Sequence, residues 1–73
     1  MRINLIDLRK KNNLTQQEMA KLLDIARTTY TGYENGTFSP SFEKALQIKK
    51  ILKAKNDDIF LNYNDRITDK KEA

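Results

Sequence analysis

The sequence predicts an all-α fold in which five short helices enclose one compact core. Apolar residues recur at the three- and four-residue spacing of a helix face in several separate segments. Residues that start and stop helices stand between these segments, and no segment shows the alternating pattern of a strand. The chain has 73 residues, so it holds a single domain, because a chain this short buries only about 60% of its unfolded surface.

The first helix is predicted over residues 3–11. Leu5 and Leu8 form an apolar stripe, and the cationic run 9–11 follows them. Positive side chains are favourable near a helix C-terminus, and the two asparagines that come next are typical of a stop. The helix therefore ends before residue 12.

The second helix is predicted over residues 16–23. Thr15 and Glu18 have the spacing of a capping box, in which each side chain bonds the backbone N–H of the other residue. The helix therefore starts directly after Thr15. Its apolar positions follow helical spacing and end before Asp24; they are Met19, Ala20, Leu22 and Leu23.

The third helix is predicted over residues 27–34, after a turn at Asp24 and Ile25. Asp is one of the residues that tolerate the backbone of such a turn. Ile25, Tyr30 and Tyr33 supply the inward face of the helix. Gly36 ends it, because glycine adopts the left-handed cap conformation at low cost.

The fourth helix is predicted over residues 42–53, with Ser41 as its cap. Its apolar residues are Phe42, Ala45, Leu46, Ile48, Ile51 and Leu52. Acidic residues followed by an apolar run predict a short fifth helix over residues 57–62. Residues 1–63 thus form the folded domain, and the polar tail 64–73 is expected to be disordered.

Composition excludes most kinds of chemistry. The chain has no Cys and no His, which removes thiol nucleophiles, imidazole bases and the usual zinc ligands, so we expect no enzyme activity, no metal and no cofactor. No apolar run is long enough to cross a bilayer, and no small-molecule site is evident. A cytoplasmic protein, associated with the nucleoid if it binds DNA, is the expectation.

The positive charge is concentrated in the body of the chain. Residues 1–55 contain 11 Lys and Arg against 5 Asp and Glu, whereas residues 56–73 contain 3 against 5. A basic body suits a polyanionic partner such as DNA, although a solvated lysine-rich face would give the same balance.

Two short helices joined by a tight turn are either an ordinary helical hairpin or a DNA-reading helix-turn-helix. On a helical wheel, Arg27, Thr28, Thr31 and Gly32 share the outward face of the third helix. Arg27 has the forked donor that pairs with guanine, and threonine can bond a base edge or contact a thymine methyl. Gly32 costs about 1 kcal/mol relative to Ala inside a helix, and close approach to DNA would explain it, as would a weak spot in a marginal helix. These details favour the DNA-reading motif.

Residues 14–36, and more loosely 3–61, resemble the helix-turn-helix family of phage Cro proteins and lambda-type repressors, the xenobiotic-response-element family of regulators. The matching features occur in family order: Leu14-Thr15-Gln16-Gln17-Glu18, Ala20, the turn at Asp24-Ile25, Tyr33-Glu34-Asn35-Gly36, Pro40-Ser41 and Asp57-Asp58-Ile59-Phe60. The resemblance implies a lambda-repressor-like domain of five helices, with the third helix in the major groove.

The resemblance also assigns roles to single residues. Gln16 is expected to bond a phosphate and to brace Arg27, and Gln17 beside it also to meet the DNA backbone. Backbone contacts are further implied for the loop after the third helix and for one lysine of the fourth, namely Asn35, Gly36, Thr37 and Lys44. Three residues depart from the family pattern: Asp24 replaces a turn glycine, Ala26 a capping Ser or Thr, and Gly32 a position that often carries a reading side chain.

The leading interpretation is a sequence-specific DNA-binding transcriptional regulator, a Cro-like or small phage or mobile-element repressor. It would bind a near-palindromic double-stranded DNA operator as a homodimer, with contacts from Phe60, Leu61 and Tyr63. A fragment of a larger repressor would have the same features. The alternative is a helical protein-interaction module, antitoxin-like or anti-repressor, whose binding would resist salt where DNA binding would not.

Overall fold

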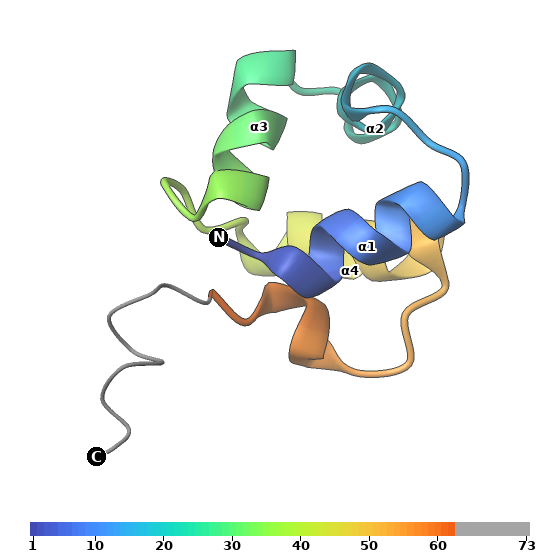
Figure 1. Ribbon diagram of the computed structural model, residues 1–73. Coiled ribbons are helices and arrows are strands. Elements are labelled where there is room, and N and C mark those ends of the chain that lie inside the picture. The colour runs from blue at the N-terminus through green and yellow to red at the C-terminus, as the bar shows by residue number, and fades with distance from the viewer. Residues whose placement is uncertain (63–73) are drawn as a thin grey trace.

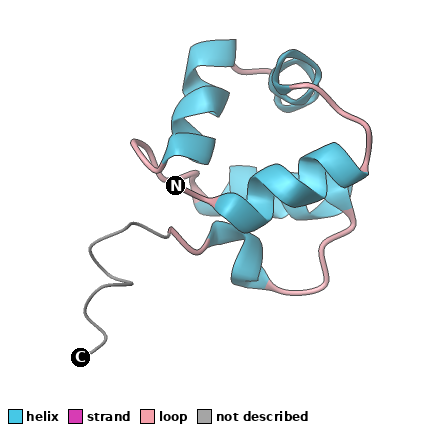
Figure 2. Ribbon diagram, viewed as in Figure 1, coloured by secondary structure: helices cyan, strands magenta, loops and turns pink. Residues whose placement is uncertain are grey.

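The computed structural model describes residues 1–62, which contain four α-helices and one 3₁₀ helix and no strand (Figures 1 and 2). The elements in chain order are α1 (Ile3–Lys11), α2 (Gln16–Leu23), α3 (Arg27–Asn35), α4 (Phe42–Leu52) and η1 (Asp57–Phe60). The all-α class is confirmed, and the four long helices begin where the sequence predicts. The predicted tail 64–73 and Tyr63 lie outside the described residues.

The fifth element differs from the prediction of a helix over residues 57–62. It is a 3₁₀ helix of 4 residues. The Asn56 side chain accepts a hydrogen bond from the Asp58 N–H at 3.0 Å and so starts it. Leu61 already has extended backbone, so the helix ends at Phe60. The acidic start was predicted correctly, and the length was wrong.

Side-chain caps explain why α2 and α4 begin where they do. The Glu18 N–H donates to Thr15 Oγ1 at 3.0 Å, and the Thr15 N–H donates to Glu18 Oε1 at 2.8 Å, which completes the predicted capping box. Ser41 Oγ accepts from the Lys44 N–H at 3.2 Å. Ala26, before α3, provides no such bond, so α3 starts without a side-chain cap.

The turn between α2 and α3 is left-handed at Asp24, with φ 57° and ψ 47°. This is the conformation for which the sequence pattern favours Gly, Asn or Asp. α3 ends at Gly36, which has φ 88°, as predicted. α2 packs chiefly on α3, and Figure 1 shows this pair at one end of the molecule, with α1 and α4 at the other. The turn therefore sets how α3 stands relative to the rest of the domain.

The core is formed by buried apolar residues from all five elements: Leu5, Met19, Ala20, Leu23, Tyr30, Tyr33, Ile48, Leu52 and Ile59. Ile25 is partly buried against them, so the predicted inward face of α3 is confirmed. Three apolar residues of the predicted helix faces do not belong to the core, because Leu22, Phe42 and Leu46 are exposed. α2 and α4 each pack against the core with one face, and the opposite face, including these residues, is exposed to solvent.

Arg2 ties the start of the chain to two distant segments. Its buried guanidinium donates to the carbonyl oxygens of Tyr33 and Phe38, at 2.7 and 2.8 Å, and to that of Phe60 at 3.1 Å. Its backbone N–H donates to the Glu34 carbonyl at 2.8 Å. The end of α3, the loop after it and the end of η1 are thereby held together. None of the helices within residues 1–62 has the length and apolar character needed to span a bilayer.

Candidate nucleic-acid interface

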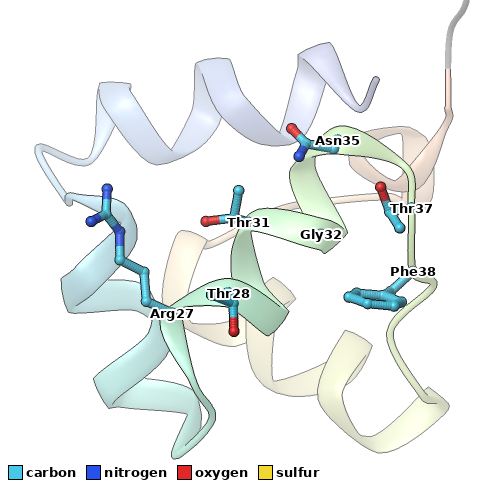
Figure 3. A pocket seen from close by; sticks show the side chains of 7 residues that line it. All are labelled: Arg27, Thr28, Thr31, Gly32, Asn35, Thr37 and Phe38. Atoms are coloured by element: carbon cyan, nitrogen blue, oxygen red, sulfur yellow. The ribbon is translucent and has the colours of Figure 1, made fainter.

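A shallow hollow of about 350 Å³ lies between the outward face of α3 and the loop that follows it (Figure 3). It is lined by Arg27, Thr28, Thr31, Gly32, Asn35, Thr37 and Phe38. All four residues that the sequence predicts to read bases are therefore brought together here. Two of the predicted DNA-backbone residues, Asn35 and Thr37, lie at the same place, and Phe38 was not predicted.

Arg27 and Thr31 are linked to the start of α2 through Gln16. Arg27 Nη2 donates to Gln16 Oε1 at 3.5 Å, and Thr31 Oγ1 donates to the same oxygen at 3.3 Å. Arg27 and Thr28 are exposed, and Figure 3 shows both projecting from the first turn of α3. The structure thus places Gln16 where it can orient Arg27; its contact with a phosphate stays a prediction.

Gly32 has a packing role that the sequence did not indicate, and its contact with DNA stays a prediction. The sequence suggested a bare backbone position that DNA could approach, but Gly32 is buried. The ring of Phe38 lies against it, so that a Cβ at residue 32 would overlap two of the ring carbons. The glycine is needed because the aromatic ring of the following loop occupies the space of its missing side chain.

Two more of the predicted DNA-backbone residues, Gly36 and Lys44, make hydrogen bonds within the protein, and their contacts with DNA stay predictions. The Gly36 N–H donates to the Gly32 carbonyl at 3.1 Å, which closes the end of α3. Lys44 Nζ donates to the Leu23 carbonyl at 2.7 Å, which caps the C-terminus of α2. Gln17, Asn35 and Thr37 are exposed and remain candidates for contact with the DNA backbone.

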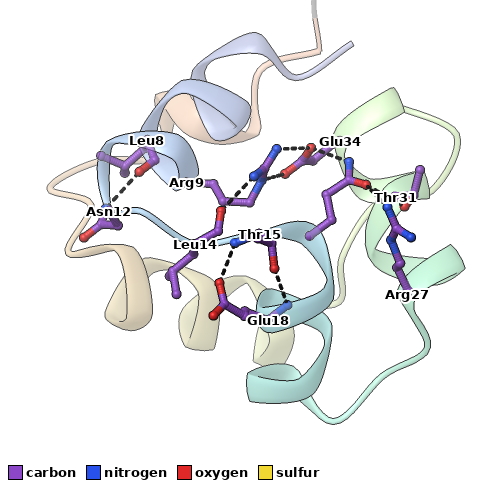
Figure 4. A network of polar contacts seen from close by, with 10 residues as sticks. Leu8, Arg9, Asn12, Leu14, Thr15, Glu18, Arg27, Thr31 and Glu34 are labelled. Atoms are coloured by element: carbon purple, nitrogen blue, oxygen red, sulfur yellow. Dashed lines mark hydrogen bonds and ion pairs between the residues drawn. The ribbon is translucent and has the colours of Figure 1, made fainter.

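Behind the hollow is a buried polar network that sequence reasoning missed (Figure 4). Glu34, with 2% of its surface exposed, forms an ion pair with Arg9, whose Nε lies 2.6 Å from Glu34 Oε2. Gln16 Nε2 donates to Glu34 Oε1 at 2.9 Å, and Arg9 Nη1 donates to the Leu14 carbonyl at 2.8 Å. α1, α2 and α3 are therefore joined through one carboxylate.

The network fixes the charge state of its members. Burial alone would raise the pKa of Glu34, but the hydrogen bonds from Arg9 and Gln16 and the charge of Arg9 outweigh it and lower that pKa. The Arg9 pKa is raised, first by its hydrogen bond with Glu34. Burial, and then the neighbouring Glu34 carboxylate, raise the pKa of Tyr30. Glu34 and Arg9 thus both stay ionised at neutral pH, and the Gln16 amide is held in one orientation.

The predicted dimer residues are described only in part. Leu61 is exposed, whereas Phe60 is half-buried and packs against the core, and Tyr63 lies outside the described residues. Phe60 also lines a groove of about 310 Å³ with Phe42 and Leu46 of α4. Phe42 is 80% exposed. The exposed apolar surface near the end of the described chain therefore includes α4, which the sequence did not predict as part of a dimer contact.

Comparison with known proteins gives a consistent result. A profile described as helix-turn-helix matches residues 5–56. An uncharacterized HTH-type transcriptional regulator from Archaeoglobus fulgidus is 34% identical over 71 residues, which cover 97% of this chain and all of that protein. A second one, from Methanocaldococcus jannaschii, is 39% identical over 57 residues, or 78% of this chain and 86% of its own.

More partial similarity extends to a phage protein. The cryptic phage CTXphi transcriptional repressor RstR of Vibrio cholerae is 39% identical over 45 residues, which cover 62% of this chain and 40% of the repressor. No solved structure matches the chain significantly. The profile match covers α2, α3, α4 and all of α1 except its first two residues, and it includes the turn between α2 and α3. On these grounds the chain belongs to the helix-turn-helix family of the Cro and lambda-type repressor proteins.

Proposed function

We propose that this protein is a sequence-specific DNA-binding transcriptional regulator that inserts α3 into the major groove. The observation that carries the proposal is the hollow along α3, which Arg27 and the threonines of α3 line with no carboxylate among the lining residues. Arg27 suits guanine O6 and N7, and Thr28 and Thr31 suit other base edges. The HTH-type regulators similar to it over most of its length support the same function.

The buried network supports recognition, because it supplies rigidity behind the reading face. Glu34 holds Gln16, and Gln16 in turn accepts hydrogen bonds from Arg27 and Thr31. A side chain that is already oriented loses less conformational entropy when it meets a base. Gln17 lies in the first turn of α2, and Asn35 and Thr37 lie at and just after the end of α3. These three residues would contact the phosphates and hold the domain in position on the DNA.

We further propose that the protein acts as a homodimer on a near-palindromic operator, as a Cro-like or small mobile-element repressor. One α3 reads only a half-site, and two related by a twofold axis would span about 34 Å, one turn of B-DNA. The exposed apolar surface of Phe42, Leu46 and Leu61 is the proposed contact. The partial similarity to the phage repressor RstR is in keeping with repression.

Selection of bound duplexes from a random pool tests the function directly. We expect an enriched near-palindrome, and binding to it should weaken steeply as salt rises, because phosphate contacts release counterions. Failure to enrich any motif would contradict sequence-specific binding. A helical protein-interaction module would show instead no enrichment and a partner interaction that resists salt.

Arg27 is expected to read one base pair in each half-site. Arg27→Ala should lose about 1–3 kcal/mol of discrimination at that pair, because a bidentate contact to guanine disappears. Arg27→Lys is the matched control, since it keeps the charge but not the fork. Repeating the selection with both variants checks this: a shared loss of preference at one position indicates base readout. Preferences unchanged in Arg27→Ala, with uniformly weaker binding, would make Arg27 a phosphate contact.

A further inference from the structure

Phe38 is a large apolar side chain in a hollow whose other lining side chains are polar. It has 51% of its surface exposed, although it lies directly against α3. Figure 3 shows its ring beside Gly32, on the same side of the helix as Thr28. One part of the ring is therefore packed against the protein, and the other part remains open within the proposed reading surface.

The backbone of Phe38 is fixed on both sides. Its N–H donates to the Gly32 carbonyl at 3.2 Å, and its carbonyl accepts from Arg2 Nη1 at 2.8 Å. Arg2 is itself buried and held by three further acceptors, namely Tyr33 O, Phe60 O and Ser39 Oγ. Although it belongs to a loop, Phe38 is positioned like a residue of the helix.

Gly32 makes room for this arrangement. Any side chain at residue 32 would overlap the Phe38 ring, beginning with its Cβ. At residue 32 α3 therefore presents no side chain of its own, and the ring from the loop covers that place. The aromatic ring supplies the contact surface that a longer residue 32 would otherwise supply.

We propose that Phe38 is a base-reading residue that contacts the 5-methyl group of a thymine in the operator. This proposal rests on the proposed function, and it adds a specificity-determining residue outside α3. A phenylalanine ring can neither donate nor accept a conventional hydrogen bond, so it cannot use the polar groups of base edges. In the major groove the apolar group on a base edge is the thymine methyl, and that is the partner the ring suits.

The geometry also places the thymine. Gly32 follows Arg27 by five residues, which corresponds to about 7.5 Å along a helix axis. Base pairs are about 3.4 Å apart, and a helix in the major groove crosses them at an angle. The methyl group should therefore lie within about two base-pair steps of the pair that Arg27 reads.

The test combines protein and DNA changes in the full chain. Random-pool selection first gives the operator, and each thymine is then replaced by uracil, which lacks the methyl group. For the unmodified protein, replacing one particular thymine in one half-site should weaken binding about fourfold, the effect of losing one buried methyl. In Phe38→Ala the same replacement should have no effect, because the ring that contacts the methyl is gone.

Two further variants sharpen the test. Gly32→Ala leaves Phe38 present but displaces its ring, so the methyl effect should again vanish, while circular dichroism reports an intact helical domain. Leu22→Ala is the matched control, because Leu22 is also half-exposed but lies outside the hollow. It should retain the fourfold methyl effect. Agreement of Phe38→Ala with Gly32→Ala, and of Leu22→Ala with the unmodified protein, supports the proposal.

Several results would overturn it. A methyl effect that persists in Phe38→Ala would assign the thymine to Thr28 or Thr31. Uniformly weaker binding by Phe38→Ala, with every preference unchanged, would place the ring against deoxyribose. In both cases the proposed function stands, because a motif has been selected. If the unmodified protein selects no motif, the proposed function fails, and this proposal fails with it.

Discussion

The Glu34→Ala variant is expected to be largely unfolded at 25 °C. It leaves the Arg9 guanidinium buried without its counter-ion, which costs about 3–5 kcal/mol. A single small core of this size provides about the same total stability. Glu34 also holds Gln16, so a second buried bond is lost. Circular dichroism during urea titration measures the effect, as a midpoint shifted to near zero denaturant.

A double variant distinguishes the cost of leaving Arg9 buried without a partner from the effect of removing the Glu34 carboxylate itself. Arg9→Met with Glu34→Leu removes both charges and fills the space with apolar groups, and such replacements of buried pairs are often neutral or stabilising. We therefore expect it to fold. Glu43→Ala, at an exposed glutamate of α4, should change stability by no more than about 0.5 kcal/mol. A Glu34→Ala protein as stable as its parent would show that the network contributes no net stability.

The Arg9–Glu34 pair should also make the stability of the protein decrease at low pH. Because the pKa of Glu34 is lowered in the folded protein, the folded state binds its proton less readily than the unfolded chain does. Its contribution to stability is present above the ordinary glutamate value of 4.5 and is lost as the pH falls through the lower, folded pKa. The urea midpoint of the parent protein should thus fall in this acid range, and the Arg9→Met, Glu34→Leu variant should lack this part of the decrease.

Leu46→Lys is expected to weaken operator binding by hundreds-fold without unfolding the domain. Leu46 is 46% exposed beside Phe42 and Phe60, so a lysine is tolerated in the monomer. Buried in a dimer contact, the same ammonium would be unpaired and costly. Each monomer would then bind one half-site independently, and the gain in affinity from two connected α3 helices would be lost. Analytical ultracentrifugation and titration against operators with one and two half-sites measure both effects.

Leu22→Lys is the matched control for this prediction. Leu22 is 57% exposed, and the substitution adds the same charge at a place outside the groove. It should keep the dimer and lose little affinity. A parent protein that sediments as a monomer, both free and on DNA, with one copy per operator, would refute the dimer.

Local sequence signals predicted the helices well, because each signal acts within a few residues. The capping box of Thr15 and Glu18, the Ser41 cap and the left-handed Gly36 set the helix ends almost to the residue. The 3₁₀ helix was the exception. Its acidic start resembles that of an α-helix, and only the short run before the extended Leu61 distinguishes the two.

The candidate site was predicted only on its outward side. Helical spacing placed Arg27, Thr28 and Thr31 together, since they lie on one face of a single helix. The Arg9–Glu34 pair joins residues 25 positions apart, and no local pattern indicates which arginine meets which glutamate. The same holds for Gly32 and Phe38: a glycine within a helix was a visible anomaly, but its cause lay in the following loop. The bond of Lys44 to the end of α2 was not predicted either, because it depends on how α4 packs.

The hydrogen bonds of the Arg2 guanidinium bear on how the proposed dimer would select the spacing between two half-sites. It bonds the carbonyl of Phe38, at the reading hollow, and that of Phe60, beside the proposed dimer contact. Arg2 therefore couples these two segments, and we expect each protomer to bind DNA as one rigid unit. In the proposed dimer the distance between the two α3 helices would be set by the fold, so that the protein would discriminate operators by half-site spacing as well as by sequence.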